Sequence, residues 1–149
     1  VFERAQNIRG FQIASPSLIG IRCVQTAFSM IKEAGIDAIA HKAAVGTQMM
    51  IDLYDAWLAP LGFVLNTSRD PKERGGHISL VHPDAAQICV AMREISNVIP
   101  DYRTPNSIRL AISPLPTSFV EVWDGFARTR DLVTSGQYKT IKEGGSRVT

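Results

Sequence analysis

The arginine at position 109 stands in a segment that otherwise has the pattern of a half-buried strand. Ile108 and Leu110 flank it, and because side chains alternate between the two faces of a strand, Arg109 shares its face with Ser107 and Ala111. A guanidinium group is rarely buried without a partner, and its planar fork fits a carboxylate through two parallel hydrogen bonds. The pattern alone fits either a carboxylate-binding arginine or a solvent-facing one.

A second candidate for chemistry is the pair Ser15-Pro16, which follows Ala14. Serine is a preferred N-cap and proline fits the first helical position, so the pair predicts a helix start. The free amide groups of a helix N-terminus also attract anions. The pair is therefore either a simple cap or part of an anion site.

The histidines do not predict a metal site. His41, His77 and His82 lack the spacing of paired ligands, and no cluster of acidic residues accompanies them. The hydroxyl residues, such as Ser79, have no His-Asp arrangement that would make one of them a nucleophile. We expect neither a bound metal nor a catalytic residue in this chain.

The elements that must position these residues follow from hydrophobic periodicity and turn residues. Helices are expected over 15–35 and 37–58, and two more are expected to begin at Asp84 and Ser118. Gln87 and Glu121 lie three residues after these two starts, which is the spacing of a capping box. Strands are expected over 63–65, 77–81 and 107–112, with an extended segment at 98–103.

This order of elements favours an α+β fold, with a small, mostly antiparallel sheet and helices packed on one of its faces. Residues 1–14 are expected to be a lead-in, 15–135 the domain itself and 136–149 a polar, frayed tail.

Composition sets the class of protein. The chain has 149 residues, of which 45% are apolar and 20% charged, enough for one buried core. Its net charge of +2 is scattered, which argues against nucleic-acid binding. No apolar run approaches the ~20 residues of a membrane span. Cys23 and Cys89 fall in predicted helices and are expected in the core, so we expect a cytoplasmic protein.

Two runs of residues form motifs. Residues 75–83 read Gly-Gly-His-Ile-Ser-Leu-Val-His-Pro, and residues 105–119 read Pro-Asn-Ser-Ile-Arg-Leu-Ala-Ile-Ser-Pro-Leu-Pro-Thr-Ser-Phe. Together they resemble the C-terminal domain of the kynureninases, and the resemblance extends over residues 8–132.

The resemblance implies an activity and a role for each candidate. Kynureninases use pyridoxal 5'-phosphate bound to a lysine and hydrolyse kynurenine or 3-hydroxykynurenine to an anthranilate and alanine, in tryptophan catabolism and NAD biosynthesis. By the resemblance, Arg109 binds the substrate α-carboxylate. Ser15, with Ala14 in place of the family's glycine, contacts the cofactor phosphate of the neighbouring subunit in a homodimer. His77 supports the entry to its strand, and Pro116 stands where the family commonly has tyrosine.

The resemblance also implies that residues 1–14 lead in from a large domain that holds the cofactor lysine. The chain begins with Val1, so we expect the end of a longer polypeptide that is inactive when isolated. Two alternatives stay open. One is the same domain of a class V aminotransferase or a cysteine-desulfurase-like enzyme, and the other is a non-catalytic dimerisation or ligand-binding module.

Overall fold

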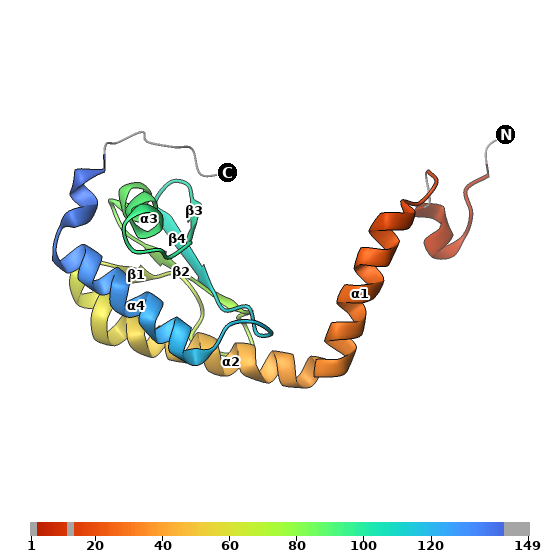
Figure 1. Cartoon of the computed structure of the whole chain (residues 1–149), viewed down its shortest axis with the longest axis horizontal. Helices are drawn as coiled ribbons and strands as arrows, with labels where there is room; N and C mark the ends of the chain where they lie inside the picture. Colours follow the sequence, from red (N-terminus) through yellow and green to blue (C-terminus); the bar gives the residue numbers. More distant parts are fainter. Residues whose placement is uncertain (1–2, 12–13, 142–149) are drawn as a thin grey trace. The chain divides into compact units, whose positions relative to one another are not determined.

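The computed structural model of this chain describes residues 3–11 and 14–141. The chain divides into two compact units, residues 1–36 and 37–149, which are treated separately below (Figure 1). None of the helices within the described ranges combines the length and apolar content that a membrane span requires.

The first unit holds a short 3-10 helix, η1 (Asn7–Phe11), and the helix α1 (Leu18–Ala34). The N-cap of α1 is Ser17, whose Oγ accepts a hydrogen bond from the backbone N–H of Gly20 at 3.1 Å. The prediction that Ser15 caps this helix is therefore wrong, because the helix begins after the proline and its neighbour. The predicted end is confirmed, since Gly35 adopts a φ of 81° and donates to the carbonyl of Ile31.

The two cysteines have different environments. Cys89 is fully buried, as predicted, and burial raises the pKa of its thiol to about 12. Cys23 is exposed on α1, a helix with no buried residue, so the prediction that it is a core residue is wrong.

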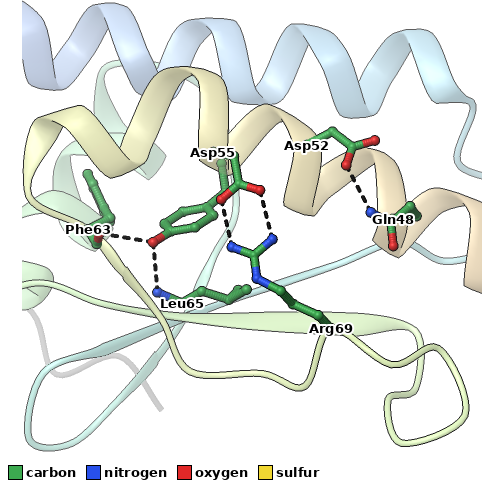
Figure 2. Close-up of polar contacts among 7 residues, drawn as sticks. Gln48, Asp52, Asp55, Phe63, Leu65 and Arg69 are labelled. Carbon is green, nitrogen blue, oxygen red and sulfur yellow. Dashed lines mark hydrogen bonds and ion pairs between the residues drawn. The ribbon is translucent and has the colours of Figure 1, made fainter.

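The helix α2 (Ile36–Leu53) continues as a π-helical turn, η2 (Tyr54–Leu58), and a 3-10 turn, η3 (Ala59–Leu61). This confirms the helix predicted over 37–58. Gly62 ends the run with a φ of 91°, a conformation that glycine adopts without strain. The hydroxyl of Tyr54 then donates to the carbonyl of Phe63 at 3.3 Å and accepts from the N–H of Leu65 at 3.1 Å (Figure 2).

A four-stranded antiparallel sheet follows in the order β1-β2-β4-β3, which confirms the predicted sheet. Its strands are β1 (Val64–Leu65), β2 (His77–Val81), β3 (Asp101–Arg103) and β4 (Ser107–Ala111). Only the last residues of the segment predicted to be extended, 98–103, pair as a strand. Arg109 therefore lies on an interior strand of the sheet, between β2 and β3.

One face of the sheet carries the core. Ile78, Leu80, Ile108 and Leu110 are buried there with side chains of α2, η2, α3 (Ala85–Glu94) and α4 (Phe119–Thr134). The helices α2 and α4 run side by side in Figure 1, and α4 packs on η2 through Trp123 and Trp57, whose ring centroids are 5.5 Å apart. Helices packed on one face confirm the predicted α+β class.

The two predicted capping boxes differ. At α4 the box is confirmed, because Ser118 Oγ accepts from the N–H of Glu121 and the Glu121 carboxylate accepts from the N–H of Ser118. At α3 the box is wrong. Asp84 instead accepts a hydrogen bond from the hydroxyl of Tyr138 at 2.9 Å, and Gln87 donates to the carbonyl of Ile141 at 3.0 Å.

These contacts tie the end of the described chain to the domain. Tyr138 lies on the short helix η4 (Gln137–Thr140) and is buried, so this side chain anchors η4 to the domain, in contrast to the frayed tail that the sequence predicts. The rest of that tail, residues 142–149, falls outside the described residues.

The capping box at α4 gives a stability prediction. Ser118→Ala removes the hydroxyl that satisfies the N–H of Glu121, so we expect a loss of about 1 kcal/mol in the free energy of unfolding, measured by urea denaturation. Thr117→Ala is the control, because Thr117 is the neighbouring hydroxyl residue and lies outside the capping box, which consists of Ser118 and Glu121. Equal losses for the two variants would contradict the capping role.

Candidate functional site

The face of the sheet opposite the core carries the polar residues. Strand pairing places Arg109 between Ser79 on β2 and Asp101 on β3. Along β4 its neighbours on this face are Ser107 and Ala111, both short. Small residues around Arg109 leave its guanidinium open to approach, and 38% of its side chain is exposed.

Two arginines share one carboxylate oxygen on this face. Oδ2 of Asp101 accepts from Nε of Arg103 at 2.9 Å and lies 2.8 Å from Nη2 of Arg103. The same oxygen pairs with Nη2 of Arg109. Among the described residues, Nε and Nη1 of Arg109 meet no hydrogen-bond acceptor, so these two donor groups are free.

The arginines keep Asp101 ionised. Partial desolvation acts to raise the pKa of its carboxyl group, but the hydrogen bond and charge of Arg103, followed by the charge and hydrogen bond of Arg109, outweigh it. The pKa therefore lies below its usual value. Because two guanidinium groups face one carboxylate, the cluster keeps a surplus positive charge at neutral pH. That charge and the free donors of Arg109 suit a carboxylate ligand.

The loop before β2 is held to the helices. Arg69 pairs with Asp55 of η2 through two hydrogen bonds of 2.7 and 2.8 Å (Figure 2). The hydrogen bond from Arg69 lowers the pKa of the Asp55 carboxyl group, which desolvation acts to raise. Arg74 donates to the side chains of Thr47 at 3.0 Å and Gln48 at 2.8 Å. These contacts fix the loop where the chain enters β2, the strand that pairs with β4 beside Arg109.

The three histidines have different surroundings. His82 is buried, and its Nδ1 accepts a hydrogen bond from the N–H of Asp84 at 3.0 Å, at the start of α3. Its ring lies 4.6 Å from that of Phe63. His77 and His41 are exposed. No group of His, Cys, Asp and Glu that could hold a metal ion occurs in the part of the chain that the structure describes.

The candidates from the sequence fall in different units of the chain. Arg109 lies in the cluster with Asp101 and Arg103, whereas Ala14 and Ser15 lie in the first unit, where both are exposed. Pro116 is exposed in the segment between β4 and α4.

Sequence reasoning missed Asp101 and Arg103. A signal was present, because the turn between Arg103 and Ser107 sets a hairpin register that places Asp101 opposite Arg109. Opposite charges at paired positions of a hairpin therefore predict this cluster.

The family profile and the relatives found by comparison with known proteins agree on one family. The sequence profile of the family described as kynureninase C-terminal domain matches residues 39–128. A kynureninase of Geobacillus thermodenitrificans is 38% identical over 129 residues, which cover 87% of this chain and 30% of that protein.

Two further kynureninases cover 93% of the chain. The one from Shouchella clausii is 35% identical over 138 residues, and the one from Bacillus thuringiensis is 33% identical over 138 residues. In both cases the match covers 32% of the relative. The chain thus spans about a third of the length of the relatives that it matches.

The Asp101 cluster gives a prediction on pH. Asp101 is expected to titrate below the ordinary value of 3.8 when its carboxyl carbon is followed by NMR, and Arg103→Gln should raise that pKa. Because the pKa is lower in the folded than in the unfolded chain, the ion pairs stabilise the fold above the unfolded pKa. This contribution is lost as the pH falls through the folded pKa. An Asp101 pKa at or above 3.8, or one insensitive to Arg103→Gln, would contradict the pairing.

Proposed function

The chain belongs to the kynureninase family, and we propose that it supplies the domain that binds the substrate α-carboxylate in a pyridoxal-phosphate-dependent hydrolase. The enzyme hydrolyses kynurenine or 3-hydroxykynurenine to anthranilate or 3-hydroxyanthranilate and alanine. One observation carries the proposal. Arg109, inside the family-matched residues 39–128, offers two free donor groups on the open face of the sheet.

The binding role follows from the chemistry of the guanidinium. The two oxygens of the carboxylate accept from one fork of the guanidinium, Nη1 with Nη2 or Nε with Nη2, because the contact with Asp101 occupies only one N–H of Nη2. The surplus positive charge of the cluster balances the negative charge of the ligand. Because β4 is paired on both sides, the backbone of Arg109 is held in place. The arginine thereby fixes the orientation of the amino acid, while the bond that breaks lies further along the substrate.

The cofactor site is proposed to lie largely outside these residues. Pyridoxal phosphate, when bound, serves as the electron sink for bond cleavage. Lys32, Lys72 and Lys139 are exposed and Lys42 is half-buried, so no lysine among the described residues has the enclosed environment that the covalent site requires. We assign Ser15, with Ala14 before it, only a contact with the cofactor phosphate of the neighbouring subunit in a cytoplasmic homodimer. The exposure of Ser15 supports that contact.

The alternatives are less well supported. A class V aminotransferase or a cysteine-desulfurase-like enzyme also needs an arginine for an α-carboxylate, but the family match and the relatives described above are kynureninases. A non-catalytic dimerisation or ligand-binding module is less well supported for the same reason, since the relatives described above are all enzymes of the kynureninase family.

The role of Arg109 is tested in the enzyme that carries this domain. Arg109→Lys keeps the charge but loses the planar fork, and Arg109→Ala loses both, so each should reduce kcat/KM for kynurenine. Loss of a carboxylate clamp costs roughly 2–5 kcal/mol, which corresponds to a reduction of about thirtyfold to several thousandfold for the alanine variant. Steady-state kinetics measures the effect.

Folding and cofactor binding are measured beside the kinetics. Both should stay nearly unchanged, because the Arg109 side chain is partly exposed and lies outside the core. Arg128→Ala is the matched control, since Arg128 forms an exposed ion pair with Asp124 on α4. Near-normal kcat/KM in both Arg109 variants would remove this arginine from the site.

The isolated 149-residue chain should not hold the cofactor covalently. We expect no stoichiometric lysine adduct after pyridoxal phosphate is added, because the described lysines are exposed or half-buried. Borohydride reduction followed by mass spectrometry measures the stoichiometry and the site. A single adduct per chain, abolished by substitution of one particular lysine, would contradict this assignment.

A further inference from the structure

Asp101 holds Arg109 by a contact that leaves much of the guanidinium unused. It stands directly opposite Arg109 in the β3–β4 pairing, and its Oδ2 pairs with Nη2 of Arg109. Nε and Nη1 of Arg109 make no hydrogen bond among the described residues, so the nitrogens on both sides of Nη2 still have a donor to offer. A contact of this kind restricts the side chain without saturating its donors.

We propose that Asp101 is a positioning residue, which orients Arg109 for the substrate carboxylate and is itself held by Arg103. The inference rests on the proposed function of Arg109 and adds to it the residues that prepare the arginine. Asp101 acts through Arg109 and is not assigned a contact with the substrate.

The need for such a residue follows from the surroundings of Arg109. Its neighbours on the open face, Ser79, Ser107 and Ala111, are too short to restrict a long side chain by packing. A free arginine loses rotamer freedom when it binds, and fixing one such side chain in advance is worth up to about tenfold in affinity. The carboxylate of Asp101 is the acceptor that the structure provides for this purpose.

Arg103 completes the arrangement. It approaches the same oxygen of Asp101 through Nε and Nη2, at 2.9 and 2.8 Å, while 59% of its own side chain is exposed. If Asp101 faced Arg109 alone, their charges would cancel. With Arg103 present, Asp101 is held in place and the cluster stays positive, so the anchoring carboxylate does not abolish the attraction for a carboxylate ligand.

The test is a double-mutant cycle in the full-length holoenzyme. Asp101→Ala is expected to raise KM for L-kynurenine about tenfold with little change in kcat, whereas Asp101→Asn, which keeps an acceptor oxygen, should have a smaller effect. Because Asp101 acts through Arg109, the Asp101→Ala effect should disappear in the Arg109→Ala background. Hydrolysis of L-kynurenine amide, which lacks the carboxylate, should be insensitive to Asp101→Ala.

Controls separate positioning from a structural role. Asp124→Asn removes the carboxylate of another exposed ion pair, that with Arg128 on α4, and should leave both substrates unaffected. Thermal unfolding is measured for every variant. If Asp101→Ala does not fold, Asp101→Asn takes its place in the cycle. Its effect on KM is likewise expected to disappear when Arg109→Ala is also present.

The outcomes distinguish this inference from the proposed function. If Arg109→Ala itself leaves KM and kcat for L-kynurenine unchanged, the proposed function fails. If Arg109→Ala impairs the enzyme but the Asp101 effect is absent, is additive in the cycle, or extends equally to the amide, the positioning role is overturned. A lower KM in Asp101→Ala would also overturn it, since it would make Asp101 a competitor of the substrate.

Discussion

The alternation of side chains along β2 and β4 is the constraint on which the rest of this molecule depends. Ile78, Leu80, Ile108 and Leu110 must face the helices, because burying each large apolar side chain is worth ~1.5–3 kcal/mol. The residues between them then face the opposite way. A slip of one residue in β4 would turn Arg109 into the core and expose its apolar neighbours. The hydrophobic core thereby determines where the charged cluster stands.

The cluster itself contributes little to stability. Its side chains are about 37% to 59% exposed, and ion pairs this accessible to water are worth little in folding free energy. Its importance lies in geometry and charge. Asp101 is placed opposite Arg109 by the register of a hairpin, and the cluster retains free donors and a surplus positive charge. Both are properties of a binding surface.

The other side of the domain shows how distant segments hold the strands in place. The hydroxyl of Tyr54 joins the end of the long helix to β1, and Arg69 fastens the following loop to η2 (Figure 2). Arg74 fastens the same loop to α2. The arginines of this loop are paired, because the helix presents acceptors to the loop along its length. Contacts with η2 and α2 thus fix the position of the chain where it enters β2.

The sequence by itself determined the elements and the family. Periodicity located the four helices and the strands, Gly35 and Gly62 marked helix ends, and two motifs identified the kynureninase resemblance. These signals are local, because they depend on residues a few positions apart.

Contacts between distant segments could not be predicted from such local signals. Tyr138 on Asp84 and Arg74 on Thr47 join residues far apart in the chain, and the choice of Ser17 over Ser15 as a cap depends on the backbone path after Pro16. Arg109 was found from its type and place in a strand, but its partners Asp101 and Arg103 required the register of the hairpin. Only the tertiary structure decided which face of the sheet is open, because the helices cover a face by burying apolar area contributed by elements from α2 to η4.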